Sequence, residues 1–429
     1  MKYKCDKSQL PWALAIDLCK KYIKKPRKAD YLLEELVKNH NVEARRNSQF
    51  LFLGALRHWS LIHNVLEPLY TKQPNLGLRA LLIIGLFEIF EKPEDAPKII
   101  HFAVDFAKHN LSVGESRFVN AVLRKASIRL AEVKELAEAG SLNELALCYS
   151  HPVWLIKRWE KEFGIEITKN YLKWNQLPPA IYARARNHVP LPVDLFEKTP
   201  WDDFYRYTGK DWSKVEALLA QGDIYIQDPS TQISPKLLTL KKGMHMLDLC
   251  AAPGGKSLLL ADELAKAGGG MLASVDLPNK RFTLLKENLL KAPENVTSQI
   301  IGCDVFELTE AVLSENNVPE LFDAVLLDVP CSNTGVIRRR PDIKERLTEN
   351  DFTQLPELQQ KLLQQAARFV RPGGQLVYST CSIDEAENEA VVKVFLAENP
   401  TFELKETKLI YPWEENRDGA GAFLLARKE

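Results

Sequence analysis

Two cysteines follow apolar runs that have the length and composition of buried strands. Cys331 stands in Asp-Val-Pro-Cys-Ser at the end of residues 322–330, and Cys381 stands in Ser-Thr-Cys-Ser after residues 374–380. Parallel strands bring their carboxyl ends to one edge of a sheet, so we expect the two thiols to lie near each other. A lone cysteine is usually a small buried apolar residue, but two at neighbouring strand ends favour thiolate chemistry.

This arrangement suits methylation of a pyrimidine at carbon 5. Carbon 5 of cytosine is a poor nucleophile until a thiolate adds at carbon 6 and turns the ring into an enamine. A carboxyl group such as Asp328 can hydrogen-bond N3 and the exocyclic amine while charge develops. The proton on carbon 5 must then leave and the first thiol must be eliminated, and a second thiol can assist there.

The sharpest local motif spans residues 244–260, where an apolar strand over residues 244–250 ends in Asp248-Leu249-Cys250 and a helix is predicted from near Lys256. The small-residue turn between them, Ala251-Ala252-Pro253-Gly254-Gly255, lets a cofactor approach the backbone closely. The segment contains neither GxxxxGK[ST] nor GxGxxG, which disfavours ATP and nicotinamide cofactors.

Acidic residues end the next two predicted strands, 272–277 and 298–304. Asp276 is placed to bind ribose hydroxyls, and Asp304 to accept a hydrogen bond from an adenine amine. Each of them alone is more often a turn residue. Three acidic strand ends in succession favour a nucleoside cofactor without a phosphate grip, which indicates S-adenosylmethionine.

Length and composition indicate a large globular protein. The chain has 429 residues, of which 45% are hydrophobic and 27% charged, so about two to four domains are expected and wholesale disorder is excluded. No apolar run reaches the roughly 18 residues that would span a membrane. The seven cysteines are far apart and form no CxxC pair, so we expect no disulfide framework, no metal site and a cytoplasmic location.

Charge divides the chain into two halves. Residues 1–200 hold 31 Lys and Arg against 22 Asp and Glu, whereas residues 201–429 hold 26 against 35. A basic front half suggests polyanion binding that serves a catalytic back half, although an ordinary solvated surface is an equal alternative.

The hydrophobic pattern predicts three regions. Residues 1–145 show helical spacing throughout, and residues 146–235 are rich in proline and predict a small α+β module with a helix near 153–163 and a strand near 223–227. Residues 236–429 alternate strands with helices around 256–267, 280–291 and 355–370. This alternation predicts an α/β, Rossmann-like domain with a parallel sheet covered on both faces.

These motifs together resemble the RNA 5-cytosine methyltransferases of the NOL/NOP/Sun group. The resemblance rests on DLCAAPGGK (248–256), DVPCSNTGVIRRRPDIK (328–344) and YSTCS (378–382). It extends through IQDPSTQISPKLL (226–238), YSHPVWLIKRW (149–159) and, more weakly, FVNAVLRK (118–125). The layout is similar to a bacterial member that acts on 16S ribosomal RNA, which implies a NusB-like, RNA-binding front domain, an RNA-facing middle module and a monomer.

The resemblance also implies roles for individual residues. Cys381 is the attacking nucleophile, Cys331 assists release of the methylated base, and Asp328 lies against both cofactor and cytosine. Arg338, Arg339 and Arg340 are expected to meet RNA. The residues expected to contact S-adenosylmethionine are Cys250, Ala251, Ala252, Pro253, Gly254, Gly255, Lys256, Asp276, Asp304 and Asp328.

The chain departs from the family pattern at two places. The family usually shows Arg-x-Asn after the Pro178-Pro179 pair, but here residues 182–187 read YARARN, which puts substrate contacts in doubt. The family's Gly-Asp-Gly-Phe-Phe is replaced by Gly-Ala-Gly-Ala-Phe over residues 419–423, which puts packing near the site in doubt.

Three alternatives remain at this point. The protein could be a DNA-type cytosine methyltransferase that attacks with Cys331, although Cys381 would then have no role. It could act on transfer RNA with the same chemistry. It could also be a non-catalytic RNA-binding factor built on the helical domain, against which the intact cofactor loop and both cysteines argue.

Overall fold

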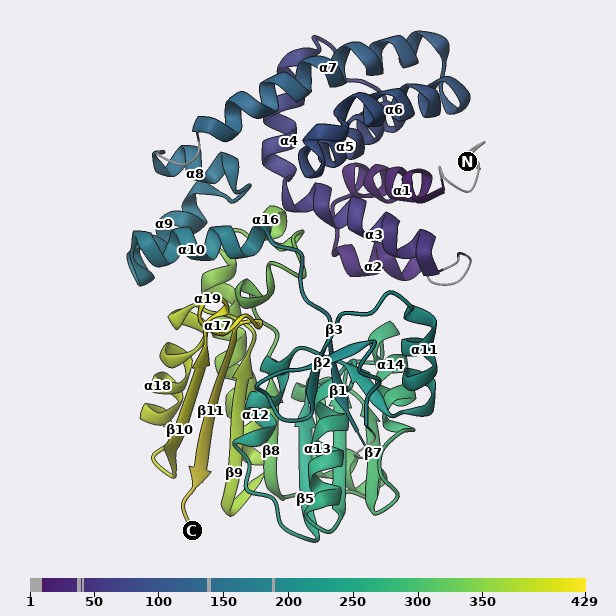
Figure 1. Cartoon of the computed structure of the whole chain (residues 1–429). Helices are drawn as coiled ribbons and strands as arrows, with labels where there is room; N and C mark the ends of the chain where they lie inside the picture. Colours follow the sequence, from purple (N-terminus) through teal and green to yellow (C-terminus); the bar gives the residue numbers. More distant parts are fainter. Residues whose placement is uncertain (1–9, 37–39, 41, 137–139, 187–189) are drawn as a thin grey trace. The chain divides into compact units, whose positions relative to one another are not determined.

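The computed structural model describes residues 10–36, 40, 42–136, 140–186 and 190–429 (Figure 1). The chain divides into two compact units. The helical unit comprises Met1–Pro179 and Ile337–Leu347, and the sheet unit comprises Ala180–Val336 and Thr348–Glu429. These boundaries differ from the three predicted regions, because the first two helices of the expected middle module, over residues 153–176, belong to the helical unit, whereas its strands and the helix over residues 212–221 belong to the sheet unit.

The helical unit contains the helices predicted for residues 1–145, two helices that follow them and one short helix from far along the chain. They are α1 (Leu10–Lys24), α2 (Ala29–Leu33), α3 (Val42–Arg57), α4 (Trp59–Leu66), α5 (Leu76–Glu91), α6 (Ala96–Asn110), α7 (Val113–Leu136), α8 (Leu142–Cys148), α9 (Val153–Phe163), α10 (Ile165–Gln176) and α16 (Ile343–Arg346). Helix α5 is apolar on nearly all sides and is therefore the buried centre of the unit. Gly54 of α3 lies so close to it that a Cβ there would meet the Phe87 ring at 1.9 Å.

One short segment of this unit comes from far along the chain. Residues 337–347 leave the sheet unit just after the Pro-Cys motif and pack among the helices. Within the helical unit, the Arg57 guanidinium donates to the carbonyl oxygen of Arg338 at 3.0 Å, and the Lys344 ammonium donates to the carbonyl oxygen of Arg57 at 2.7 Å. These buried contacts fix a segment that the sequence pattern placed in the catalytic domain.

The sheet unit is built on a seven-stranded sheet with the order β10-β11-β9-β8-β5-β6-β7. Its strands are β5 (Met244–Leu249), β6 (Gly270–Asp276), β7 (Val296–Gly302), β8 (Phe322–Asp328), β9 (Val370–Thr380), β10 (Phe402–Ile410) and β11 (Ala420–Arg427). The first five are parallel, whereas β11 pairs antiparallel with both β9 and β10. The five predicted strands are therefore confirmed, and the antiparallel pair was not predicted.

Helices cover both faces of this sheet (Figure 1). They are α12 (Ile233–Lys236), α13 (Gly255–Lys266), α14 (Lys280–Leu289), α15 (Glu310–Glu315), α17 (Asp351–Arg368) and α18 (Glu389–Glu398), and the short α19 (Pro412–Glu415) lies in the connection between β10 and β11. Alternate residues of β5 point into different cores: Leu247 and Leu249 pack with residues of α17 and α18, and Met246 packs with residues of α13 and α14. This two-sided burial explains the continuous apolar runs of the parallel strands and confirms the α/β, Rossmann-like prediction.

A second, four-stranded antiparallel sheet with the order β2-β3-β1-β4 belongs to the same unit. Its strands are β1 (Tyr182–Ala185), β2 (Phe196–Lys198), β3 (Phe204–Tyr207) and β4 (Ile224–Ile226), and α11 (Trp212–Gln221) packs against them. The expected helix at 153–163 and strand near 223–227 are present as α9 and β4. In the part of the chain that the structure describes, no helix combines the length and apolarity needed to cross a membrane.

Candidate active site

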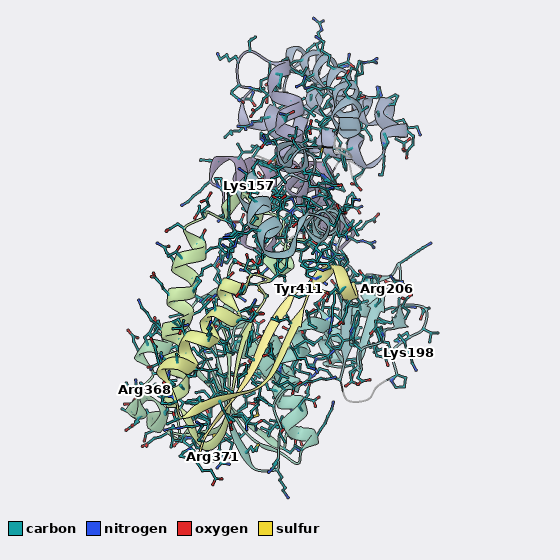
Figure 2. All side chains as sticks on the ribbon, turned by 90° about the vertical axis from the view of Figure 1, so that its left-hand side faces the viewer. Lys157, Lys198, Arg206, Arg368, Arg371 and Tyr411 are labelled. Atoms are coloured by element: carbon teal, nitrogen blue, oxygen red, sulfur yellow. The ribbon has the colours of Figure 1, made fainter. Side chains whose placement is uncertain are left out.

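The parallel strands bring the predicted site residues of the sheet unit to one edge. Strands β8, β5, β6 and β7 are neighbours in that order, so Asp328, Asp248 and Asp276 end adjacent strands, with Asp304 just beyond the last. Strand β9 adds Cys381 beside the end of β8. Figure 2 shows Arg371, near the start of β9, at the opposite end of the unit from Tyr411, which follows β10. We call the end that carries the cysteines the carboxyl edge.

The two cysteines are in direct contact. Their sulfur atoms are 3.2 Å apart, and both side chains are partly buried. The Cys381 thiol donates to the amide oxygen of Asn333 at 3.3 Å, and the Asn333 amide nitrogen donates to the carbonyl oxygen of Cys331 at 2.6 Å. Either sulfur can donate in this contact, and a Cys381 proton directed to the Asn333 oxygen leaves Cys331 as the donor. This hydrogen bond, together with burial, holds the pKa of Cys331 well above its ordinary value.

Glycines keep the two cysteine loops close together. The amide of Gly335 donates to the carbonyl oxygen of Cys381 at 2.9 Å, and the amide of Gly419 donates to the carbonyl oxygen of Gly335 at 2.9 Å. A Cβ on Gly335 would meet both the Cys381 oxygen and the Gly419 backbone within 3.0 Å. Gly419 of the altered Gly-Ala-Gly-Ala-Phe segment therefore packs directly against the loop that follows Cys331.

Lys256 connects the candidate cofactor loop, the turn Ala251–Gly255, to the ends of β8 and β9. Its ammonium forms an ion pair with Asp328 and donates to the Ser379 hydroxyl at 3.1 Å. The sequence predicted both charged residues as cofactor contacts but gave no sign of this pairing, because 72 residues separate them. The pair places a positive and a negative group between the glycine turn and the cysteines.

Side chains from two following elements brace the cofactor loop. The Asp276 carboxylate accepts the Ala252 amide at 2.8 Å, Arg281 donates to the Ala252 carbonyl at 2.8 Å, and Asn288 donates to the Pro253 carbonyl at 2.8 Å. Gly254 adopts φ +99°, a conformation that glycine tolerates best. The turn is thus held rigidly at the start of α13.

Two further acidic residues, Asp304 and Asp248, differ in their exposure and in their hydrogen-bond partners. Asp304 is partly exposed and accepts the amide of Phe306 at 2.9 Å, which makes it a cap as well as a candidate ligand. Asp248 is fully buried, accepts the Ser257 hydroxyl at 2.5 Å and has a second oxygen for which the described residues provide no partner. Burial raises the pKa of Asp248 to about 7, against the opposing hydrogen bond from Ser257.

This raised pKa gives a stability prediction. The folded protein keeps Asp248 protonated at pH values where the unfolded chain ionises it. The contribution of Asp248 to the free energy of unfolding is therefore complete below pH 4 and is lost as pH rises through 7. Asp248→Asn removes that loss, so the free energy of unfolding of the variant relative to wild type should rise between pH 4 and 7 by up to about 1.4 kcal/mol per pH unit. Urea titrations check this. Ser274→Ala, at the buried position paired with Asp248 on β6, is the non-titrating control, and a difference that does not vary with pH for Asp248→Asn would contradict the argument.

The predicted RNA contact of the arginine triplet needs correction at Arg338. Its side chain is only 3% exposed, and its guanidinium lies 3.7 Å from the centre of the Trp174 ring. Arg340 forms an ion pair with Asp30 at 3.2 Å, and Arg339 is partly buried. Arg338 is thus an internal group of the helical unit, because the Trp174 ring, far away in the sequence, covers its guanidinium.

The departure from the family pattern at residues 182–187 also has a structural role. Arg184 and Arg186 are buried and both pair with Asp262 of α13 at 2.6 Å, which ties the small sheet to the helix behind the cofactor loop. Asn187 lies outside the described residues. The arginines therefore act in packing, which the sequence pattern did not indicate.

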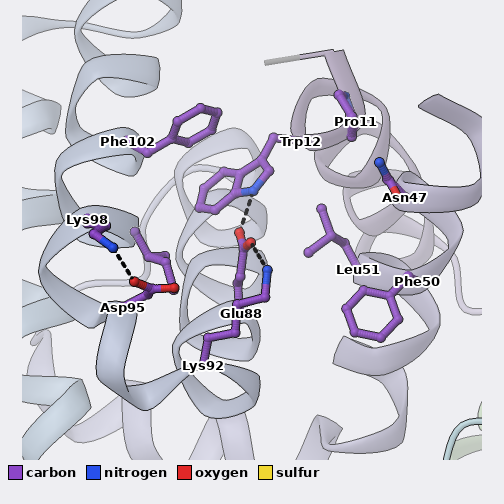
Figure 3. A pocket seen from close by; sticks show the side chains of 11 residues that line it. Pro11, Trp12, Asn47, Phe50, Leu51, Glu88, Lys92, Asp95, Lys98 and Phe102 are labelled. Carbon is purple, nitrogen blue, oxygen red and sulfur yellow. Dashed lines mark hydrogen bonds and ion pairs between the residues drawn. The ribbon is translucent and has the colours of Figure 1, made fainter. Parts of the chain in front are cut away.

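A cavity in the helical unit is unrelated to these residues. It has a volume of about 420 Å³ and is lined by residues of α1, α3, α5 and α6, among them Trp12 and Phe102 (Figure 3). Polar side chains that line the cavity are paired with one another: the Trp12 ring nitrogen donates to Glu88 at 2.7 Å, and Lys98 forms an ion pair with Asp95 at 2.6 Å. Among the described residues, no cluster of three or more His, Cys, Asp and Glu side chains could hold a metal ion.

Comparisons with known proteins agree with this architecture. The family described as 16S rRNA methyltransferase RsmB/F matches residues 235–421, and the NusB family matches residues 14–127. The crystal structure of PH0851 aligns over 100% of both chains with a TM-score of 0.77 and 23% identity. A methyltransferase homologue from Pyrococcus horikoshii aligns over 67% of this chain and 98% of its own with a TM-score of 0.54 and 24% identity. Both likenesses establish the fold.

Curated relatives are similar over most of the chain. A probable ribosomal RNA small subunit methyltransferase B from Bacillus subtilis is 31% identical over 392 residues, covering 87% of this chain and 85% of that protein. Its namesake from Pseudomonas putida is 33% identical over 77% of this chain and 75% of its own, and that from Thermus thermophilus is 30% identical over 89% and 88%. The chain therefore belongs to the RsmB/F family of 16S ribosomal RNA methyltransferases.

Proposed function

We propose that this methyltransferase transfers a methyl group from S-adenosylmethionine to carbon 5 of a cytosine in 16S ribosomal RNA through a covalent Cys381–cytosine adduct. The observation that carries the proposal is the pair of thiols 3.2 Å apart at the ends of adjacent strands, beside the Lys256–Asp328 ion pair. Methylation that needs no covalent activation would have no use for two sulfurs in contact.

The carboxyl edge fits the proposed cofactor. The nucleoside part of S-adenosylmethionine donates from its ribose hydroxyls and its adenine amine, and the partly exposed carboxylates of Asp276 and Asp304 are acceptors at the ends of β6 and β7. The turn Ala251–Gly255 ends at the amino terminus of α13, which favours a carboxylate. When bound, the cofactor supplies an electrophilic methyl group on a sulfonium sulfur.

The chain's own groups account for the addition step. The Cys381 thiol first releases its proton to solvent, and the resulting thiolate adds to carbon 6 of the cytosine, so that the ring becomes nucleophilic at carbon 5. Asp328 lies beside the cysteine loops, where its carboxyl group can hold N3 and the exocyclic amine. Lys256 holds that carboxyl group in place through the ion pair.

Release requires a proton to leave carbon 5 and the Cys381–carbon 6 bond to break. The Cys331 thiol is a hydrogen-bond donor 3.2 Å from the Cys381 sulfur. It can pass its proton to the departing sulfur, and the Cys331 thiolate that results can accept the proton from carbon 5. Atoms and charge balance, and both cysteines return to thiols. The raised pKa of Cys331 keeps this proton in place until release.

The substrate proposal rests on the family. The members that match are named for the small-subunit ribosomal RNA, and the basic front half of this chain suits a polyanion. We propose that the protein works as a monomer in the cytoplasm, where ribosomal subunits are assembled. The same chemistry on transfer RNA remains the second candidate, and RNA substrates of both kinds distinguish the two.

A binding measurement tests the cofactor site. Asp276→Ala removes the acceptor proposed for the ribose and also the brace on the Ala252 amide, so S-adenosylmethionine should bind about 5- to 150-fold more weakly, as expected for about 1–3 kcal/mol of lost hydrogen bonding. Calorimetry measures this. Asp323→Ala is the matched control, because Asp323 lies near the other end of β8 and pairs with Arg371. Equal affinities for wild type and Asp276→Ala would rule out the proposed site.

A further inference from the structure

One buried carboxylate contacts both cysteine loops. Glu387 is fully buried, and its side chain accepts four hydrogen bonds from uncharged donors. One oxygen accepts the hydroxyls of Ser332 and Ser382, the latter at 2.7 Å. The other accepts the Ser332 amide and the Gln359 amide, both at 2.9 Å. Ser332 directly follows Cys331, and Ser382 directly follows Cys381, so a single side chain ties together the residues next to both sulfurs.

The backbone of Glu387 is fixed as well. The Tyr378 hydroxyl donates to its carbonyl oxygen at 2.7 Å, and the neighbouring Asn388 amide donates to the carbonyl oxygens of Ser382 and Asp384 at 3.0 Å. Tyr378 and Ser382 flank the nucleophile on β9 and its loop. The carboxylate therefore cannot shift without moving the segment that carries Cys381.

A charge in this position is costly. Burial raises the pKa of Glu387, and the hydrogen bonds from Ser332 and Ser382 oppose the shift only in part. A buried ionisable group often makes the folded state less stable than a well-packed apolar residue would, and it can be retained because it secures a particular geometry. The geometry that it secures here is the distance between the two loops, since three of the four donated hydrogen bonds come from Ser332 and Ser382. The fourth donor, Gln359 of α17, also donates to the carbonyl oxygen of Pro330, next to Cys331, at 3.0 Å.

We propose that Glu387 is a positioning residue that sets the spacing of Cys331 and Cys381 and so couples adduct formation to release. It acts through Ser382 on the attacking thiol and through Ser332 on the releasing thiol. Because addition and release are separate steps, the two serines should have different effects on turnover. The spacing itself is independent of any substrate, whereas the effect on turnover rests on the proposed function.

The spacing can be measured without RNA or cofactor. A disulfide needs the sulfurs at about 2.05 Å, roughly 1 Å closer than they lie here. Diamide takes up two electrons and two protons as the two thiols form one S–S bond, and peptide mapping identifies the Cys331–Cys381 product. We expect wild type to form it readily and Glu387→Met, which keeps the length but accepts no such bonds, to form it at least about tenfold more slowly.

Two matched variants separate positioning from other roles. Glu387→Gln keeps an acceptor for the two amides, and its amide nitrogen can donate to the serine hydroxyls, which can reverse their roles. It should therefore pair its cysteines within about threefold of wild type. Gln360→Ala removes a neighbouring amide of α17 that bonds Val391 instead, and it should behave as wild type. If Glu387→Gln formed the Cys331–Cys381 disulfide as slowly as Glu387→Met, the positioning role would be contradicted.

If Glu387→Met does not fold, the double variant Ser332→Ala, Ser382→Ala takes its place in the experiment. It removes the two hydroxyl hydrogen bonds to the Glu387 carboxylate. Pairing at the wild-type rate in either folded variant would overturn the inference. Turnover then tests the coupling: Ser332→Ala should accumulate protein–RNA adduct, and Ser382→Ala should slow methylation without accumulation. Identical effects of the two would contradict the separate roles. Slow pairing in Glu387→Met, with no methylation even by wild type, would uphold the spacing and refute the proposed function.

Discussion

Cys381→Ala should abolish methyl transfer to RNA. Without the sulfur no bond forms at carbon 6, carbon 5 stays unreactive, and the rate should fall by roughly 10⁴-fold or more, as for loss of other enzyme nucleophiles. Transfer of a radiolabelled methyl group to 16S ribosomal RNA measures this. The variant should keep its affinity for S-adenosylmethionine, because the cofactor loop and Asp276 lie on other strands.

Cys148→Ala is the matched control. Cys148 is a partly buried free cysteine of the helical unit whose thiol donates to a carbonyl oxygen of α7. It should methylate as wild type does. Substantial methylation by Cys381→Ala would show that another group attacks and would remove the basis of the mechanism.

Cys331→Ala should trap the reaction after methylation. The attacking thiol remains, so the adduct forms and the methyl group is transferred, but the proton donor 3.2 Å from the Cys381 sulfur is gone. Single-turnover methylation should stay within about tenfold of wild type while steady-state turnover falls by roughly 100-fold or more. The stalled species should migrate as a slow protein–RNA band on a denaturing gel.

The DNA-type alternative predicts the mirror image. If Cys331 attacks, the adduct should survive in Cys381→Ala and disappear in Cys331→Ala. The contact between the sulfurs is compatible with either order. The assignment therefore depends on which variant carries the RNA, and peptide mapping of the adduct identifies the sulfur directly.

The sequence predicted the parallel strands and the motifs at their ends because both are local signals. Each parallel strand is a short apolar run, and each site residue follows one. Strand β10 was missed because only Phe402 and the last residues of the strand face the core, while exposed charged residues fill the middle. An edge strand of this kind carries no apolar alternation.

Contacts between distant segments were beyond prediction. The arginine triplet was interpreted as a basic surface, but Arg338 is covered by Trp174, more than 160 residues away in the chain. Glu387 sits in the acidic run Glu385-Ala-Glu387-Asn388-Glu389, which is typical of a solvated helix start. Its role depends on Ser332, 55 residues away. The sequence does contain one signal for this contact, which is the serine that directly follows each of the two cysteines.

Nucleoside analysis of methylated RNA tests the central claim most directly. Purified protein is incubated with unmodified 16S ribosomal RNA and S-adenosylmethionine, the RNA is digested to nucleosides, and the products are identified by mass spectrometry against standards. The account predicts 5-methylcytidine, formed by wild type and absent with Cys381→Ala. A methyl group on N4 of cytidine, on a ribose oxygen or on another base would contradict it, because none of those positions needs a thiol at carbon 6.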